Sequence, residues 1–350
     1  MRVLIVTTWF PSADKPGEAP FNLAHAKAVA DRHDVHVVHA RIWSGAPAEE
    51  AEVAGLPVTR LPFSPRSPLA AARSLAALRR LARGADVVHT MAFSSLGVVA
   101  PLYPAVRRKW VHTEHWGVLG TGAHGKALAA AKALLRLPRR VSAVSGSLGA
   151  ALRPSTRADV LVVPNVVSDF FDLVEQPAWS PVKLVAVGNL VAGKRPLLAV
   201  ETLALLPEAT LTWVGDGPLR QAVADRAAEL GVADRLTLVG AVAPQEVPKH
   251  LAEANLFFLP TEAETFLVAA AEALACGRPV VLPTLPSVAD YVDDTNGIMV
   301  GTPEPEAFAA AVRTAAERFA GHPAEAIRKT VVPRFAASGI ADRFDELYAL

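Results

Sequence analysis

The chain has 350 residues, a length that corresponds to about two domains, each large enough to bury a core. Apolar residues make up 51% of the chain and charged residues 20%, which excludes a disordered or fibrous protein. The 35 Lys and Arg residues against 34 Asp and Glu residues leave a net charge of +1. The chain therefore lacks the basic surface of a dedicated nucleic-acid-binding protein, and we expect no nucleic-acid partner.

Cysteine content and apolar runs indicate the cellular compartment of the protein. Its single cysteine, Cys276, can form neither an internal disulfide nor a cysteine-based zinc site, which is typical of the reducing cytoplasm. The apolar run at residues 3–6 is too short for a secretory signal and predicts a buried strand. Residues 87–106 carry no charge but contain Pro101 and Pro104, which would interrupt a lipid-exposed helix, so we expect no transmembrane segment.

Short β-branched runs alternate with Ala- and Leu-rich helical patterns in both halves of the chain, which is typical of βα units around a buried parallel sheet. Strands are predicted at residues 3–6, 35–39, 58–61, 87–90, 110–113, 141–144 and 160–163, and in the second half at 183–187, 210–214, 236–239, 256–259 and 280–282. Helices are predicted at residues 21–31, 69–83, 126–137, 196–205, 218–230 and 266–276.

The predicted fold class is therefore α/β, with two tandem Rossmann-like, doubly wound domains. Residues 166–182 follow neither period and predict a linker, which gives domain bounds of 1–170 and 171–337. Sheets of this kind bind ligands at the carboxyl ends of their strands, so we expect the site in a cleft between the two domains.

The most informative motif runs from residue 260 to 279, where a strand ends and two glutamates follow. Glu264 is expected in the loop at the strand's carboxyl end, and the N–H groups of Phe266, Leu267 and Val268 are expected to open a helix able to bind phosphate. Glu272, in the second turn, could accept hydrogen bonds from ribose hydroxyls. Alternatively, Glu264 is a helix cap and Glu272 a solvated surface residue.

A second loop joins a strand to a helix at residues 187–196. Gly188 and Asn189 open the loop, and Lys194 and Arg195 close it, where an ammonium group could neutralise a diphosphate beside backbone N–H donors. Alternatively, Lys194 is an exposed lysine near a helix start. A third turn, at residues 215–218, is expected to shape the loop and not to touch a ligand.

Together these motifs resemble the retaining glycosyltransferases of family 4, which have the GT-B fold, and the resemblance covers nearly the whole chain. It implies that Glu264 binds the donor sugar, Glu272 the ribose and Lys194 the diphosphate. It implies a donor-binding domain at 171–337 and an acceptor-binding domain at 1–170, which a C-terminal helix at 338–350 completes. No metal or other cofactor is expected, because Lys194 and the helix start would do the work of a divalent ion.

The chain departs from this family's usual pattern at two positions. Asn189 stands where an arginine is usual, so one positive charge near the diphosphate is missing, and Arg195 is a candidate substitute. Leu267 stands where a glycine is usual, and its side chain could narrow or redirect the donor-sugar pocket. The identity of the donor is therefore left open.

One histidine of the first domain is a candidate for the reaction. His115 follows the strand at 110–113, and the resemblance implies that it faces the donor sugar, where a neutral imidazole could bind a hydroxyl. A structural role is the alternative, and His89, His112 and His124 compete for the assignment.

The sequence predicts a metal-independent retaining glycosyltransferase of the hexosyltransferase type. Its partners would be a nucleotide-sugar donor and a small-molecule, lipid-linked or glycan acceptor. The alternatives are a nucleotide-sugar epimerase of the same fold and a catalytically silent nucleotide-sugar-binding protein. Basic helices at residues 69–83 and 126–137 would allow at most a peripheral contact with the inner face of the membrane, and solvated helix faces are the alternative.

Overall fold

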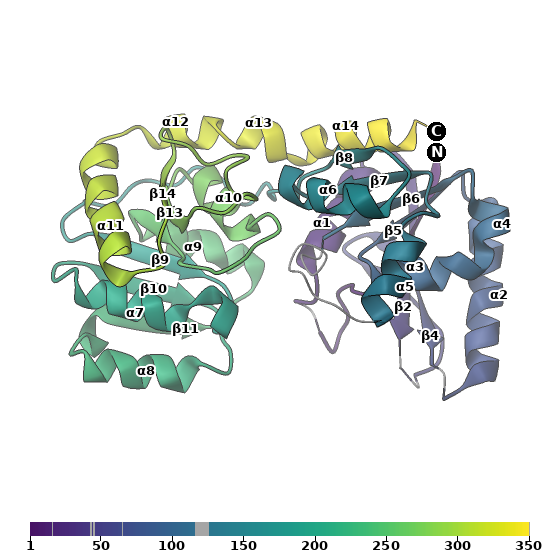
Figure 1. Cartoon of the computed structure of the whole chain (residues 1–350), viewed down its shortest axis with the longest axis horizontal. Coiled ribbons are helices and arrows are strands. Elements are labelled where there is room, and N and C mark those ends of the chain that lie inside the picture. The colour runs from purple at the N-terminus through teal and green to yellow at the C-terminus, as the bar shows by residue number, and fades with distance from the viewer. Residues whose placement is uncertain (16, 43, 45, 65, 116–125, 350) are drawn as a thin grey trace. The chain divides into compact units, whose positions relative to one another are not determined.

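The computed structural model describes residues 1–15, 17–42, 44, 46–64, 66–115 and 126–349 (Figure 1). The chain forms two compact units. Unit 1 comprises Met1–Val166 and Ala337–Leu350, and unit 2 comprises Val167–Ala336. The first crossing between units thus falls at the start of the segment that the sequence predicted as a linker.

Unit 1 contains an eight-stranded sheet with the order β3-β4-β2-β1-β5-β6-β7-β8. Every pair in it is parallel except β3 with β4. Both central strands, β1 and β5, are buried almost throughout, and β5 buries His89 and Thr90 with its apolar residues. The strands are β1 (Arg2–Thr7), β2 (Asp34–Ile42), β3 (Glu49–Val53), β4 (Leu56–Phe63), β5 (Val87–Met91), β6 (Trp110–Glu114), β7 (Arg140–Ala143) and β8 (Val160–Val162).

Strand β3 is absent from the sequence prediction. Its residues, Glu49 to Val53, include three glutamates and are mostly exposed, so the apolar alternation that marks a strand is missing. The strand forms because Ala54 and Gly55 both adopt positive φ values of 52° and 84°, the geometry of a two-residue hairpin turn. It covers the outer edge of β4.

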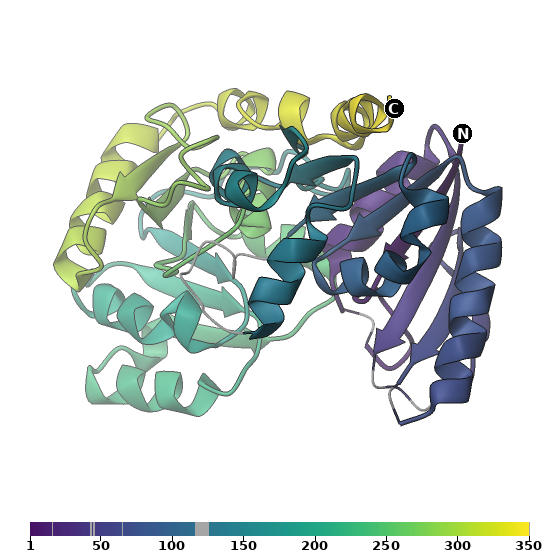
Figure 2. The same cartoon turned by 45° about the vertical axis from the view of Figure 1, so that its right-hand side comes forward.

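Helices surround this sheet, and α2 packs along β4 (Figure 2). The helix α14 begins after the chain returns from unit 2, and it packs on α1. Its apolar residues Ile340, Phe344 and Leu347 lie in the same core cluster as Val3 and Ile5 of β1. The helices of unit 1 are α1 (Pro20–Ala30), α2 (Pro68–Gly84), α3 (Ser94–Val99), α4 (Tyr103–Val106), α5 (Lys126–Leu134), α6 (Gly146–Leu152) and α14 (Ala337–Tyr348).

Unit 2 contains a six-stranded, fully parallel sheet with the order β11-β10-β9-β12-β13-β14. Its strands are β9 (Lys183–Val187), β10 (Thr210–Val214), β11 (Leu236–Gly240), β12 (Leu256–Phe258), β13 (Val280–Pro283) and β14 (Gly297–Val300). The sequence prediction omits β14, whose four residues are too few to show a period. The order reverses at β9 and β12, so the loops after these strands lie side by side.

The helices of unit 2 lie on both sides of its sheet, and α7, α8 and α11 form one continuous layer (Figure 1). On the other side α9 contacts β9 and β10, and α10 contacts β13. These helices are α7 (Pro196–Ala204), α8 (Arg220–Glu229), α9 (Val247–Ala252), α10 (Val268–Ala275), α11 (Pro305–Phe319), α12 (Ala324–Lys329) and α13 (Val332–Phe335). The predicted class, two tandem doubly wound α/β domains, is confirmed.

Candidate functional site

The loop after β9 is held in place by backbone and side-chain hydrogen bonds with β10. The Gly188 N–H donates to Val214 O at 2.9 Å, and the Trp213 indole N–H donates to Gly188 O at 2.8 Å. Arg195 adopts a left-handed conformation, with φ 49° and ψ 51°, and Pro196 follows as the first residue of α7. Because proline needs no N–H partner at that position, the helix can begin there directly.

Glycines at the neighbouring turn let the two loops approach closely. A Cβ atom built on Gly215 would lie 2.1 Å from Gly188 O, and one built on Gly217 would lie 2.6 Å from Leu190 O. In return, the Leu190 N–H donates to Asp216 O at 3.0 Å. The third turn therefore supports the Gly188 loop, which is the shaping role that the sequence predicted for it.

Lys194 and Glu264 meet, although 70 positions separate them. The Lys194 ammonium donates to Glu264 Oε1, and only 26% and 13% of the two side chains are exposed. Thr261, fully buried, donates its hydroxyl to the same carboxylate oxygen at 2.8 Å and to Gly193 O at 3.1 Å. Of the two sequence-based alternatives for Lys194, the exposed surface lysine is wrong.

The sequence analysis did not identify Thr261. Only its position in the loop after β12, three residues beyond the end of the strand, could have indicated it. Glu262 N–H also donates to Gly193 O, at 2.7 Å, so the loops after β9 and β12 are joined by both backbone and side-chain contacts. These contacts hold the two loops side by side and so bring the side chains of Lys194 and Glu264 together.

The two other residues of the Gly188 loop are more open to solvent. Asn189, which stands where the family resemblance led us to expect an arginine, is exposed. Arg195, the candidate substitute, lies 3.6 Å from a carboxylate oxygen of Glu262, and its side chain is 30% exposed. Its guanidinium group is therefore only partly neutralised by an exposed partner.

Glu272 is a half-buried residue on α10, so the predicted alternative of a solvated surface residue is wrong. Burial raises the pKa of its carboxyl group from 4.5 to about 8. Among the described residues, its carboxyl group has no hydrogen-bond partner. A buried carboxyl group without partners can still accept hydrogen bonds, so a ligand that supplies hydroxyl donors would stabilise it.

The helix of the glutamate motif begins later than the sequence predicted. We expected it to open at Phe266, but α10 begins at Val268, and Leu267 adopts a left-handed conformation with φ 61° and ψ 69°. A residue in that conformation cannot be part of an α-helix, so Leu267 is the boundary. The N–H groups of Leu267 and Val268 donate to no acceptor among the described residues.

His115 lies in unit 1 and is 7% exposed. Its ring centroid is 4.7 Å from that of Phe21 and 5.1 Å from that of His25. Burial lowers the pKa of His115 well below 6.5, an effect that nearby histidines increase and Asn165 opposes. The imidazole is therefore neutral at physiological pH, as the sequence-based role requires.

The competing histidines have partners of their own. His89 contacts Tyr348 Oη and Thr113 Oγ1, both at 2.7 Å, and His112 lies 3.2 Å from Glu114 Oε2. These contacts give both rings a structural role inside unit 1. His124 lies outside the described residues.

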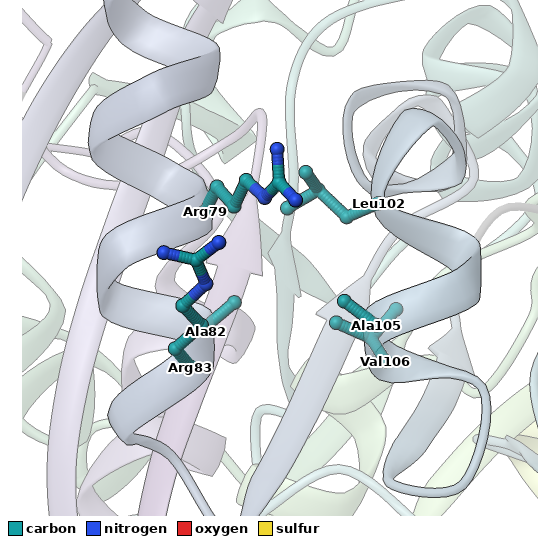
Figure 3. Close-up of a pocket in the computed structure, with 6 residues that line it drawn as sticks. All are labelled: Arg79, Ala82, Arg83, Leu102, Ala105 and Val106. Carbon is teal, nitrogen blue, oxygen red and sulfur yellow. The ribbon is translucent and has the colours of Figure 1, made fainter.

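A small hollow on unit 1 lies between α2 and α4 (Figure 3). Its lining is Arg79, Ala82, Arg83, Leu102, Ala105 and Val106. Both arginines are exposed, and neither forms an ion pair within the described part of the chain. In that same part, no helix is both long and apolar enough to cross a bilayer, and no cluster of three or more His, Cys, Asp or Glu side chains could hold a metal ion.

Two family models match the chain, one in each half. Glycosyltransferase Family 4 matches residues 21–169, and Glycosyl transferases group 1 matches residues 181–318. With two sheets that are parallel apart from the β3–β4 pair, these matches define the chain's class as the GT-B glycosyltransferases. More particularly, the chain belongs to family 4, the glycosyl transferases group 1.

One solved structure shares the fold, and two curated relatives match part of the chain. Anabaena HepE in complex with UDP has a TM-score of 0.81 at 20% identity, with 99% of each chain covered. A D-inositol 3-phosphate glycosyltransferase of Mycolicibacterium gilvum is 31% identical over 39% of this chain and 32% of its own length. A 2-deoxystreptamine N-acetyl-D-glucosaminyltransferase of Streptomyces fradiae is 30% identical over 45% of this chain and 42% of its own length. The chain thus spans less than half the length of either relative.

Proposed function

We propose that this protein is a retaining glycosyltransferase that moves a sugar from a nucleoside-diphosphate donor to an acceptor hydroxyl. The observation that carries the proposal is the meeting of Lys194 and Glu264 at the carboxyl ends of β9 and β12. An ammonium and a carboxylate beside free helix N–H groups suit a substrate that joins an anionic diphosphate to a hydroxyl-rich sugar.

Each residue of unit 2 then has a role in binding the donor. Glu272 accepts hydrogen bonds from the ribose hydroxyls, and Lys194 and the N–H groups of Leu267 and Val268 bind the diphosphate. Glu264 binds the sugar. Arg195 supplies part of the charge that Asn189 lacks. UDP in the HepE structure makes UDP-sugars the first donors to test.

Electrostatic stabilisation of the leaving group performs the chemistry. The bond between the sugar and the diphosphate oxygen breaks, and its electron pair goes to that oxygen, where Lys194 and the N–H groups stabilise the growing charge. The acceptor oxygen forms the new bond on the face that the diphosphate leaves, and its proton goes to the departing diphosphate. No side chain acts as nucleophile, and neither a metal ion nor another cofactor is needed.

The acceptor is assigned to unit 1, where His115 is a candidate catalytic residue. Its neutral imidazole can exchange a hydrogen bond with a sugar hydroxyl as positive charge develops on the sugar. The acceptor class is a glycan, a lipid-linked sugar or a small molecule with a free hydroxyl.

The test begins with a thermal-shift screen of nucleotide sugars, since a ligand of the native state raises the unfolding temperature. The selected donor is then incubated with and without acceptors in the presence of EDTA. We expect nucleoside diphosphate to be released only when an acceptor is present, with NMR showing the donor's anomeric configuration in the product. Sugar conversion without an acceptor would identify an epimerase, and binding without release a silent binding protein.

We also propose that any contact with the inner face of the membrane is peripheral and involves α2. Arg79 and Arg83 are exposed beside the apolar side chains of the hollow in Figure 3, an arrangement that suits anionic lipid headgroups. Sedimentation with vesicles of phosphatidylglycerol and phosphatidylcholine tests this. Binding to the anionic vesicles alone, lost in Arg79→Glu/Arg83→Glu, is expected, and equal recovery with both vesicle types would contradict it.

A further inference from the structure

The left-handed turn before α10 carries an unusual residue. Leu267 has φ 61° and is 5% exposed, so a branched side chain is buried at a backbone conformation that glycine adopts most easily. Something in the surroundings must therefore hold this conformation against the extended and helical alternatives.

Tyr291 provides that contact. Its hydroxyl lies 2.8 Å from Phe266 O and 3.0 Å from Leu267 O, so its single proton is shared between the two carbonyls. Burial, together with the negative charge of Glu264, raises the pKa of Tyr291 well above its usual value, so the hydroxyl stays a donor. Leu267 O also accepts from the N–H groups of Ala270 and Ala271 in α10, at 3.1 and 3.4 Å, whereas Tyr291 is the one side chain in the described part of the chain that donates to these two carbonyls.

The ring of Tyr291 is itself fixed. Its centroid is 5.3 Å from that of Phe266 and 5.5 Å from that of Phe335, which it meets at 90°. Tyr291 is 4% exposed, and Asn296 donates to its carbonyl at 2.9 Å. The hydroxyl is therefore presented from a rigid aromatic cluster and not from a mobile side chain.

Holding two carbonyls also fixes two N–H groups. In a trans peptide the N–H points away from the C=O of the same plane, so Phe266 O sets the direction of the Leu267 N–H, and Leu267 O sets that of the Val268 N–H. Neither N–H group donates to an acceptor among the described residues. N–H donors that are already oriented can bind a diphosphate without losing further conformational entropy.

We propose that Tyr291 is a positioning residue of the donor site, whose hydroxyl holds the turn at Leu267 and so aims the Leu267 and Val268 N–H groups at the diphosphate. This inference rests on the proposed function, because it takes the diphosphate as the ligand. It assigns Tyr291 an effect on diphosphate binding and turnover, and none on nucleoside binding.

The test uses Tyr291→Phe, which keeps the ring, with Tyr348→Phe as matched control. Tyr348 is also buried and its hydroxyl is also hydrogen-bonded, but it lies in unit 1. Titration calorimetry measures UDP and uridine binding to the full chain. We expect Tyr291→Phe to weaken UDP binding about tenfold, the equivalent of one hydrogen bond, and to leave uridine binding within about twofold. Tyr348→Phe should leave both affinities unchanged.

A glycine at position 267 shows whether Tyr291 acts through the conformation of this turn or through the stability of the whole fold. Glycine adopts positive φ without strain, so the turn then depends less on the hydroxyl. In the Leu267→Gly background we expect Tyr291→Phe to weaken UDP binding by less than about threefold, a non-additivity that marks direct coupling. Equal losses for UDP and uridine, the same loss in both backgrounds, or no loss would overturn the proposal. A parent chain that binds UDP but transfers no sugar contradicts the proposed function alone.

Discussion

Replacing Glu264 by Gln tests the ion pair at the centre of the candidate site. From the motif alone, a carboxylate directed at the sugar would leave the affinity for free nucleotide unchanged. The structure changes this expectation, because Glu264 accepts a hydrogen bond from the Lys194 ammonium, which we propose binds the diphosphate. Glutamine keeps the shape and still accepts the Thr261 hydroxyl, but it releases the ammonium and removes a negative charge that repels the ligand.

The size of the effect follows from the exposure of the pair. With 13% and 26% of the two side chains exposed, screening is intermediate, and the gross attraction between such charges is about 4 kcal/mol at 4 Å. Most of this attraction is offset by desolvation of the charges and by continued sharing of the Lys194 ammonium. Glu264→Gln should therefore strengthen UDP binding by about 1 kcal/mol, or about fivefold in affinity. Turnover should fall nevertheless, since the sugar loses its charged partner in the transition state.

Calorimetric titration of UDP into the parent and Glu264→Gln measures the change. Glu262→Gln is the matched control, because Glu262 is two residues away, pairs with Arg195 and has a side chain that is 62% exposed. We expect it to change UDP affinity by less than about twofold. Unchanged or weaker UDP binding by Glu264→Gln, in a protein of normal unfolding temperature, would refute the reasoning.

Four further substitutions test the remaining assignments. Lys194→Ala should barely change uridine binding, weaken UDP binding and lower turnover about 10²-fold, and calorimetry showing equal losses for both ligands would remove Lys194 from the phosphates. The pKa of Glu272 is about 8 in the folded state and 4.5 in the unfolded state, so burial of its carboxylate lowers the free energy of unfolding as pH rises from about 4.5 to 8. Glu272→Gln should therefore unfold at a higher temperature than the parent at pH 8 and at the same temperature at pH 4. A difference in unfolding temperature that does not change with pH would contradict the raised pKa. Gly215→Ala would place a Cβ 2.1 Å from Gly188 O and should lower both the unfolding temperature and UDP affinity, whereas a neutral result would show that the loops can separate. Phe344→Ala, at a fully buried position, should cost unit 1 about 3–5 kcal/mol in denaturant unfolding, and a cost below about 1 kcal/mol would mean that α14 is dispensable.

The features that the sequence predicted correctly are those with a strong local signal. Buried parallel strands appear as short β-branched runs bounded by turn residues, so β1, β5 and β9 could be predicted close to their observed bounds. The proximity of Lys194 and Glu264 follows from the observed strand order, because both residues follow strands at the switch point of one sheet, and the sequence did not give that order. What made them a pair, the bridging hydroxyl of Thr261, depends on a contact between two loops and leaves no periodic trace.

The start of α10 was wrong for a related reason. The apolar run favours a helix through Phe266 and Leu267, but Leu267 adopts a left-handed conformation and its carbonyl accepts a tertiary hydrogen bond from Tyr291, 24 residues further on. The raised pKa of Glu272 likewise depends on what covers the side chain and not on the residues beside it in the chain.

The division of the chain has a consequence for how the protein is made. Unit 2 is one continuous segment, and the two positions where the chain enters and leaves it are joined by a hydrogen bond of 2.9 Å from the Val167 N–H to Phe335 O. Unit 1 is discontinuous, and its core needs Ile340 and Phe344, which the ribosome adds after all of unit 2. Residues 1–166 are therefore synthesised before unit 2 but complete their core only after it, so their apolar surface stays uncovered while unit 2 is synthesised.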